Sequence, residues 1–479
     1  MTERLPPRWF PGALIPVAAG LAWLAIGWRT DLAFGVLASV PGGLMLGAGV
    51  ALFLWPGDRQ ITHYMALGAG LSLPLGLLAL PWAGVSAGLL FLALGVLSFA
   101  AAGRAALLLQ PVPSGAPAPE RNARMARKAA LDEAVLAYFL SAARIPGGSQ
   151  VERDLDELEQ LERLAEREGW LAEPASFHAS PPPAEPEIRA RRAARRDFLH
   201  LRFDSGYRPH PGLPGAQRWL GHAANRRAHA WVFRYEGAPR PWVLGIHGYR
   251  MGMPWLDFSL FDIDVLHHRL GFNVVLPVLP LHGPRCHHRL SGSDFLDGPM
   301  ADLLHAEAQA LWDLRRVLGW LRESERAPAV GVLGYSLGGY NAALLAAMEP
   351  DLATVIAGIP LADIPGALWH HMPPVHLHFI ESRGITRERL GRLLSPVSPL
   401  ALAPRVPRER LGLFAAAGDQ IVPPAQPLSL WRHWGEPDCH WYQGSHMSVR
   451  REASTARFVS DRLAVLGTGS VAEAVADRA

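Results

Sequence analysis

The segment VGVLGYSLGGYNAALL spans Val330 to Leu345 and carries the strongest structural signal in the chain. It begins with apolar and β-branched residues typical of a buried strand and ends in a run of helix formers. Between them, Gly334-Tyr335-Ser336-Leu337-Gly338 places a serine on a sharp turn from strand to helix. Such a turn strains the backbone and brings the chain close to itself, so small residues are needed two positions before and after the serine. Gly334 and Gly338 meet that need, and Ser336 is a candidate nucleophile.

Short β-rich runs alternate with longer helical patterns from Ala228 onward, which is typical of a mostly parallel sheet covered by helices. Apolar residues recur at spacings of three and four from Leu304 to Leu321, which predicts a helix with one buried face. The serine turn follows the fourth predicted strand. The predicted strands are Ala230 to Arg234, Trp242 to Ile246, Asn273 to Leu276, Val330 to Leu333, Thr354 to Ile359, Leu411 to Ala415 and His440 to Tyr442.

A serine hydroxyl needs a general base, and the base needs a group that holds its tautomer. Gly418-Asp419-Gln420 places a carboxylate in a loop after the predicted Leu411 strand. Gly444-Ser445-His446 places an imidazole in a loop after the last predicted strand. The order along the chain is therefore Ser336, Asp419, His446.

That order, on this alternation, resembles the α/β-hydrolase superfamily of esterases, lipases, thioesterases and peptidases over roughly Ala228 to Leu466. A further match is His247-Gly248-Tyr249 after an early strand. The resemblance implies that Asp419 is the acid and His446 the base, and that the backbone N–H groups of Tyr249 and Leu337 form the oxyanion hole. Many lipases have a run of glycines after that histidine, whereas this chain continues Tyr249-Arg250-Met251-Gly252.

Three other residues compete for these roles. Asp363 follows the predicted Thr354 strand and is an alternative acid. His440 lies inside a predicted strand, where we expect it to pack or pair locally. His282, in Leu281-His282-Gly283-Pro284-Arg285, follows a strand and either lines the pocket or belongs to a plain turn.

The first hundred residues are almost entirely apolar, and four stretches reach the ~20 residues that a membrane-spanning helix needs. Each is free of Asp, Glu, Lys and Arg. Tryptophans stand at ends of the first three (Trp9, Trp28, Trp55 and Trp82), where such rings prefer the lipid interface. A cleaved signal peptide is the alternative for the first stretch, but no small-x-small cleavage site follows it and three more apolar stretches do. The four are Trp9 to Trp28, Leu32 to Trp55, Tyr64 to Trp82 and Val85 to Ala102.

The distribution of basic residues predicts the orientation of this segment, because positive charge collects on the cytoplasmic side. Four crossings place both ends on one side, where eight basic residues would lie, against only Arg29 on the other. We therefore expect a multi-pass protein of the inner (cytoplasmic) membrane with its soluble part in the cytoplasm. The eight are Arg4, Arg8, Arg59, Arg104, Arg121, Arg124, Arg127 and Lys128.

The sequence predicts four regions: a four-helix transmembrane segment at 1–108, a linker and helical extension at 109–227, a hydrolase domain at 228–466, and a C-terminal tail at 467–479. Pro111 to Glu120 is the linker, and Ala129 to Ala143 and Gln150 to Glu168 are predicted helices. A basic cluster then either rests on anionic lipid headgroups or belongs to an exposed helix. It comprises Arg189, Arg191, Arg192, Arg195 and Arg196.

An insertion at about 361–408 is expected to form a cap over the pocket. It holds four histidines, but their spacing matches no standard zinc site, so we expect neither a metal nor a cofactor. Lys128 is the only lysine, which excludes a pyridoxal phosphate Schiff base or a Walker A loop in a folded pocket. The two cysteines, Cys286 and Cys439, belong to no metal-spaced group, and no nucleic-acid motif accompanies the net charge of +3. The histidines are His370, His371, His376 and His378.

The expected function is that of a membrane-anchored serine hydrolase that cleaves a carboxylic ester through an acyl-enzyme on Ser336. Tethering to a bilayer favours a lipid or lipid-linked ester. An acyltransferase or a peptidase would use the same triad, because the motifs specify the acyl-enzyme and not what attacks it. A membrane scaffold or sensor that binds a ligand without turnover is the alternative from another class. The sequence leaves the substrate and the oligomeric state open.

Overall fold

The computed structural model describes residues 10–55, 57–143, 147–288 and 290–467. The chain divides into two compact units. Of the described residues, those up to Ala143, Ala416–Ala425 and Trp441–Glu452 form the first unit, and all others form the second. Arg4, Arg8, Trp9 and most of the predicted C-terminal tail lie outside the described residues.

The first unit begins with four long apolar helices, as the sequence predicts. They are α1 (Leu14–Thr30), α2 (Leu32–Leu54), α3 (Arg59–Trp82) and α4 (Val85–Leu109). Within the described residues, these are the helices long and apolar enough to cross a membrane. The last two are longer than their apolar stretches, because helical hydrogen bonding does not stop where polar residues begin. Asp58 accepts a hydrogen bond from the N–H of Gln60 and caps the start of α3.

Small residues let these four helices pack closely. A Cβ atom added to Gly20 would lie 2.6 Å from the carbonyl oxygen of Gly42 on the next helix, so this contact requires glycine. At the centre, the rings of Trp23 and Phe91 stack with centroids 3.8 Å apart. The short connection of α3 to α4 passes through Gly84 at φ 98°, a conformation that favours glycine.

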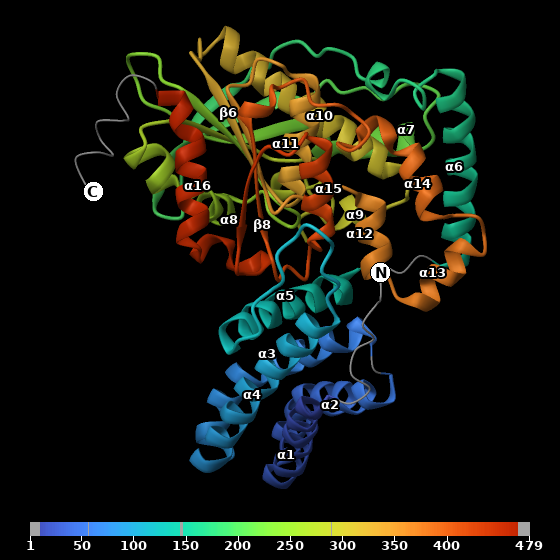
Figure 1. The fold of residues 1–479 in the computed structure, drawn as a ribbon, viewed down its shortest axis with the longest axis vertical. Coiled ribbons are helices and arrows are strands. Elements are labelled where there is room, and N and C mark those ends of the chain that lie inside the picture. The colour runs from blue at the N-terminus through green and yellow to red at the C-terminus, as the bar shows by residue number, and fades with distance from the viewer. Residues whose placement is uncertain (1–9, 56, 144–146, 289, 468–479) are drawn as a thin grey trace. The chain divides into compact units, whose positions relative to one another are not determined.

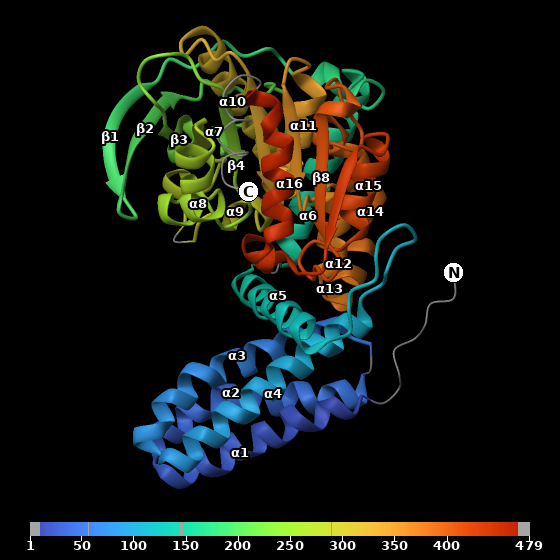
Figure 2. The same ribbon diagram turned by 60° about the vertical axis from the view of Figure 1, so that its left-hand side comes forward.

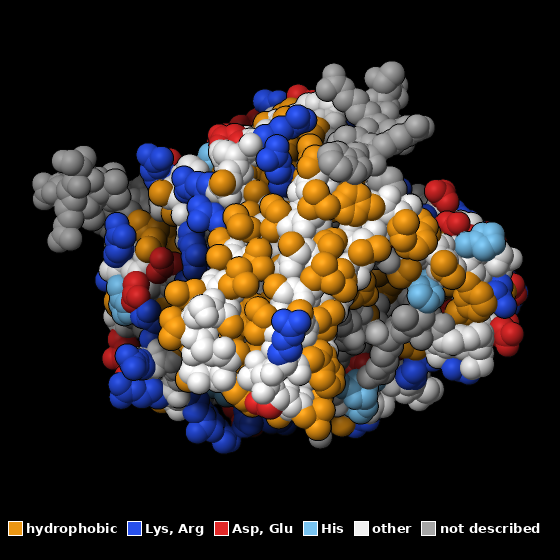
Figure 3. All heavy atoms as spheres, turned by 90° about the horizontal axis from the view of Figure 1, so that it is seen from below, with side chains coloured by type: hydrophobic (Ala, Val, Ile, Leu, Met, Phe, Trp, Pro, Cys, Tyr) orange, Lys and Arg blue, Asp and Glu red, His pale blue; other side chains and the backbone are white. Residues whose placement is uncertain are grey.

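The outer surface of these helices is apolar. Aliphatic side chains such as Leu21, Val36, Leu77 and Leu89 are more than half exposed, although each belongs to a helix of the first unit. Figure 3 shows apolar side chains gathered over the face seen from below. A surface of this kind is expected where helices meet lipid rather than water.

Two more helices follow at the predicted places. Asn122 caps α5 (Ala123–Ala142) by accepting from the N–H of Met125, and α5 packs on α3 and α4 in the first unit. The second helix, α6 (Gly148–Arg167), belongs to the second unit. Its buried side is lined by Val151, Leu158 and Leu161, and its outer side carries the Glu and Arg residues.

Nine strands of the described chain form one sheet in the order β1-β2-β3-β5-β4-β6-β7-β8-β9. Strands β4 to β8 pair in parallel, and β1, β2, β3 and β5 pair antiparallel in turn. Helix α16 lies on one side of β6 and β8, and α10 and α11 lie on the other (Figure 1). This is the α/β-hydrolase architecture that the sequence resemblance implies. The strands are β1 (Glu187–Ala193), β2 (Arg196–Asp204), β3 (Arg227–Phe233), β4 (Trp242–Ile246), β5 (Asn273–Pro277), β6 (Val330–Tyr335), β7 (Thr354–Gly358), β8 (Leu411–Ala416) and β9 (Asp438–Tyr442).

The remaining helices are α7 (Ala216–Gly221), α8 (Pro254–Leu260), α9 (Ser293–Leu296), α10 (Asp302–Glu323), α11 (Leu337–Met348), α12 (Ile364–His371), α13 (Pro374–Glu381), α14 (Arg387–Leu393), α15 (Ala425–His433) and α16 (Ala453–Leu463). The predicted amphipathic helix is α10, and its first half is buried on every side rather than on one face. Helices α12 to α14 occupy the region predicted as a cap.

The expectation of an exposed helix for the basic cluster is wrong. Its residues form the β1–β2 hairpin, with Ala194 and Arg195 in the turn at positive φ (Figure 2). Strand β1 is exposed along nearly its whole length, so it shows no alternation of buried and exposed residues. Backbone hydrogen bonds to β2 hold it in place. The sheet therefore begins at Glu187, well before Ala228.

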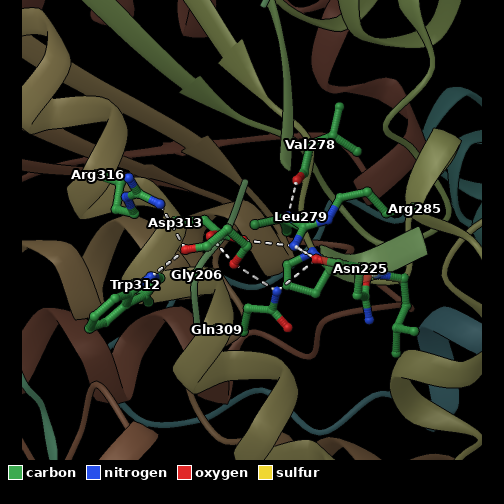
Figure 4. A network of polar contacts seen from close by, with 12 residues as sticks. Gly206, Asn225, Val278, Leu279, Arg285, Gln309, Trp312, Asp313 and Arg316 are labelled. Carbon is green, nitrogen blue, oxygen red and sulfur yellow. Dashed lines mark hydrogen bonds and ion pairs between the residues drawn. The ribbon is translucent and has the colours of Figure 1, made fainter. Parts of the chain in front are cut away.

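A buried polar network joins the early strands to α10 (Figure 4). The fully buried Arg285 pairs with Asp313 of α10 at 2.7 Å and donates to the backbone oxygens of Val278 and Asn225. Gln309 of α10 also donates to the oxygen of Asn225. Because the charge of Arg285 is both paired and hydrogen-bonded, its burial is tolerated and the chain after β5 is held in one conformation.

Candidate active site

Ser336 stands between β6 and α11 with φ 58° and ψ −116°. A side chain other than glycine is rarely found at such angles, and strain of this kind is expected of a nucleophile on a strand-to-helix turn. The structure also gives the reason for the two flanking glycines. A Cβ atom at Gly334 would lie 2.0 Å from the carbonyl oxygen of Gly338, and one at Gly338 would lie 1.9 Å from that of Ile246.

The loop proposed for the oxyanion hole lies beside this turn in the same unit. A Cβ atom at Gly248 would lie 3.5 Å from Cβ of Ser336, so the two loops approach each other closely at this point. Tyr249 is the next residue of that loop, and Leu337 is the first residue of α11. Ser336, Tyr249 and Leu337, which the sequence predicted as one site, thus share one region of the second unit.

His247 braces this loop, a role that the sequence analysis missed. Its buried Nδ1–H donates to the oxygen of Gly248 at 2.8 Å, and its Nε2 accepts from the N–H of Leu279 at 3.1 Å. Acceptance by Nε2 requires the neutral imidazole, and burial lowers the pKa of His247 to about 4. The only sequence signal was its place directly before Gly248.

Asp419 and His446 meet in the first unit. Oδ2 of Asp419 lies 2.8 Å from Nδ1 of His446, and Oδ1 accepts from the N–H groups of Ile421 and Val422 at 2.9 and 2.7 Å. Asp419 is 2% exposed. With its Nδ1–H held by Asp419, the imidazole has Nε2 available to accept a proton.

The electrostatic surroundings favour the protonated form of His446. Burial disfavours the imidazolium, but the charge and hydrogen bond of Asp419, followed by the charge of Asp132, outweigh it and raise the pKa of His446. An imidazole with a raised pKa is a stronger base once it is neutral.

Asp132 of α5 is a second residue beside these loops that the sequence analysis missed. It is fully buried, and its carboxylate accepts hydrogen bonds from the loops that carry Asp419 and His446. Burial, followed by the charge of Asp419, raises the pKa of Asp132, whereas the charge of His446 and the N–H donors of Met447 and Gln420 favour its ionised form. Two adjacent carboxylates, Asp132 and Glu133, inside the otherwise apolar stretch Ala129 to Ala137 were the available signal.

The competing residues have other partners. Asp363 caps α12 by accepting from the N–H of Gly366 at 2.8 Å, and it pairs with Arg387 at 2.7 Å. Nε2 of His440, in β9, lies 3.0 Å from Oγ of Ser454. His282 is buried in a turn and donates to the oxygen of Pro280. These contacts favour Asp419 and His446.

The histidines of the cap region lie on α12 and α13: His370 and His371 end the first, and His376 and His378 belong to the second. In the described part of the chain, His, Cys, Asp and Glu residues nowhere form a group of three or more that could hold a metal ion. Cys286 and Cys439 are free thiols.

No protein-family model matches the chain. Among solved structures, acetyl xylan esterase 1 from Thermoanaerobacterium sp. JW/SL YS485 aligns with 69% of this chain and 96% of its own, at 15% identity and a TM-score of 0.42. Acetyl xylan esterase from Paenibacillus sp. R4 aligns with 66% of this chain and 99% of its own, at 14% identity and the same TM-score. Similarity at this level carries no argument about function, and the fold assignment rests on the strand order.

Two proteins of Mycobacterium tuberculosis are far more similar in sequence. Uncharacterized protein Rv2627c (strain ATCC 25618 / H37Rv) is 41% identical over 296 residues, which are 61% of this chain and 71% of that protein. Uncharacterized protein MT2702 (strain CDC 1551 / Oshkosh) is 38% identical over 341 residues, which are 71% of this chain and 82% of that protein. Because this identity extends over most of both relatives, the chain belongs to the family of MT2702 and Rv2627c.

Proposed function

We propose that this protein is a membrane-anchored serine hydrolase with Ser336 as nucleophile, His446 as general base and Asp419 as the acid that orients the base. The observation that carries the proposal is the strained backbone of Ser336 on the β6–α11 turn. The 2.8 Å contact of Asp419 with Nδ1 of His446 supports it from the other unit. Both features cost stability. The strained backbone of Ser336 costs of order 1–3 kcal/mol, and a buried carboxylate is unfavourable unless it is hydrogen-bonded, so the fold alone gives no reason for either.

In the proposed reaction, Oγ of Ser336 attacks the carbonyl carbon of an ester while Nε2 of His446 takes its proton. Asp419 stabilises the imidazolium that forms. The N–H groups of Tyr249 and Leu337 donate to the carbonyl oxygen as it becomes an oxyanion. The imidazolium then protonates the departing alcohol, and water, deprotonated by the same imidazole, releases the acid and restores Ser336. This reaction uses no cofactor.

The proposed substrate is a carboxylic ester with an apolar acyl chain, lipid-linked or a lipid itself. The support is the apolar surface of α1 to α4, which would keep the hydrolase unit at a bilayer. We further propose that the membrane is the inner membrane and that the hydrolase unit faces the cytoplasm, on the basis of the eight basic residues against one.

The test is covalent labelling of the detergent-solubilised full chain with a fluorophosphonate probe, followed by intact-protein mass spectrometry. Wild type should gain one probe mass, Ser336→Ala should gain none, and His446→Ala should label much more slowly because the hydroxyl loses its proton acceptor. Ser324→Ala, at the exposed end of α10, is the matched control and should label like wild type.

Absence of labelling on folded wild type, or labelling that survives Ser336→Ala, would contradict the proposal and favour a scaffold or sensor. If labelling occurs as expected, incubation with p-nitrophenyl butyrate in the presence and absence of alcohol or amine acceptors separates the hydrolase from an acyltransferase. Comparing the hydrolysis of a peptide ester with that of the corresponding peptide amide distinguishes a peptidase from the ester hydrolase and the acyltransferase.

A further inference from the structure

Asp132 lies in the middle of α5, outside both loops that carry the proposed acid and base. Its Oδ1 accepts from Oγ of Ser445 at 2.8 Å and from the N–H of Met447 at 2.9 Å. Its Oδ2 accepts from the N–H of His446 at 2.8 Å and from that of Gln420 at 3.1 Å. All four donors and the carboxylate belong to the first unit.

These four bonds join two loops that are not adjacent in sequence. Gln420 follows Asp419 directly, and Ser445 and Met447 flank His446. The backbone on each side of the imidazole is therefore held by the same carboxylate that holds the loop of its acid partner. A one-residue shift of either loop would break one or more of these bonds and lengthen the 2.8 Å contact between Asp419 and His446.

The neighbouring residue, Glu133, makes the corresponding contacts with the apolar bundle. Its Oε2 lies 2.6 Å from Oγ1 of Thr62 and 2.5 Å from Nδ1 of His63, both on α3. Glu133 is 2% exposed, so these contacts are shielded from water. Helix α5 is thus held to the apolar bundle by one acidic side chain and to the loops of the proposed base by the next.

The charges that act on the His446 imidazole come from two elements. Asp419 follows β8, and Asp132 lies on α5. Lys128, one turn before Asp132, forms an ion pair with Glu452, which follows the turn that begins at His446. The positive charge of Lys128 is therefore paired, and the negative charges of Asp419 and Asp132 both favour the imidazolium of His446.

We propose that Asp132 is a positioning residue for the His446 base, and that α5 makes the membrane bundle part of the frame that holds the base and its acid. This inference rests on the proposed function of His446. Asp132 touches no substrate atom in this scheme and acts only through the two loops and through its charge.

Because all four partners of Asp132 donate to it, the isosteric change to asparagine is enough to test its positioning role. In Asp132→Asn, one carboxylate oxygen becomes an NH₂ group, which would point its hydrogens at two N–H or O–H donors. An NH₂ group at the Oδ2 position loses the bonds from His446 and Gln420, and one at the Oδ1 position loses the bond from Met447, although the Ser445 hydroxyl can turn to accept. Either orientation of the amide therefore breaks at least one backbone bond and also removes the charge. In Asp132→Glu, the charge stays but the longer side chain displaces the loops.

For Asp132→Asn we expect kcat for p-nitrophenyl butyrate to fall ~10²-fold with KM within twofold, because misplacing a catalytic group by about 1 Å costs this much. The acid limb of its pH profile should move to lower pH, because a nearby negative charge that favours the imidazolium is lost. Asp132→Glu should also lose kcat, but its limb should move less than that of Asp132→Asn, because the charge stays. Asp154→Asn is the matched control, since it alters a buried carboxylate that accepts from the N–H of Met300 in the second unit, and it should behave as wild type.

A second readout does not depend on activity. NMR of the protein labelled with ¹³C at histidine Cε1, with the His446 signal assigned by its loss in His446→Ala, should give a lower pKa for His446 in Asp132→Asn than in wild type. An equal pKa in folded protein, or Asp132→Asn and Asp132→Glu with wild-type kcat, would overturn the inference. Failure of wild type to label with fluorophosphonate would overturn the proposed function instead, and the histidine titration would still decide the role of Asp132.

Discussion

The replacement of Asp419 by asparagine tests the proposed acid most directly. Oδ1 of Asp419 accepts from the N–H groups of Ile421 and Val422. An NH₂ group at this position could not accept from these two donors. The amide oxygen of the Asp419→Asn side chain would therefore take the Oδ1 position, and its NH₂ group would face Nδ1 of His446. Nδ1 would then have to accept, and the proton would move to Nε2, where it blocks the abstraction of the serine proton.

The expected loss in kcat for p-nitrophenyl butyrate is up to ~10⁴-fold, which corresponds to about 5.5 kcal/mol of transition-state stabilisation. The protein should stay folded, because the hydrogen bonds at this position can still form with an amide in place of the carboxylate. The assay is ester hydrolysis together with fluorophosphonate labelling, with circular dichroism as the check of folding.

Asp363→Asn is the matched control, because Asp363 also follows a strand. It would lose the charge that pairs with half-exposed Arg387, and an ion pair of this kind contributes about 0–1 kcal/mol to stability. We expect wild-type turnover. Full activity of Asp419→Asn together with inactivity of Asp363→Asn would refute the assignment of the acid.

Four other properties of the protein can be checked in the same way. Gly338→Ala should lower the Tm and reduce fluorophosphonate labelling at least ~10-fold, because its Cβ would lie 1.9 Å from the oxygen of Ile246; wild-type labelling would contradict this. Burial raises the pKa of Glu307 well above its usual value, so the folded state keeps it neutral and loses stability as pH rises above the unfolded pKa, by up to about 1.4 kcal/mol per pH unit. Glu307→Gln should therefore raise the Tm more at pH 8 than at pH 5, and a pH-independent difference would count against it. The raised pKa of His446 should place the acid limb of kcat/KM above pH 6.5, since the base must be neutral, and a limb at or below 6.5 would be inconsistent with it. A reporter fused after Ala479 should be active only if it works in the cytosol, and activity of a periplasmic-type reporter there would reverse the topology.

Local patterns were enough to predict most of the elements. The Trp242–Ile246 strand has the predicted bounds, and the other predicted strands differ by a few residues at their ends. Strand periodicity, the glycine spacing around Ser336 and the apolar stretches of α1 to α4 are each contained in a short window of sequence. The β1–β2 hairpin was missed because its buried residues, Phe198, Leu201 and Phe203, do not alternate strictly and β1 buries almost none.

The sequence alone therefore determined the α/β-hydrolase class, the apolar bundle and the candidate residues Ser336, Asp419 and His446, because each depends on neighbours in the chain. Tertiary structure alone identified Asp132, which lies 314 positions from His446 and bonds to its backbone N–H. No side-chain pattern encodes a bond to a backbone amide this distant in sequence, since every residue except proline offers the same donor. The hydrogen-bond partners of a buried carboxylate depend on the loops that the fold brings within hydrogen-bonding distance of it.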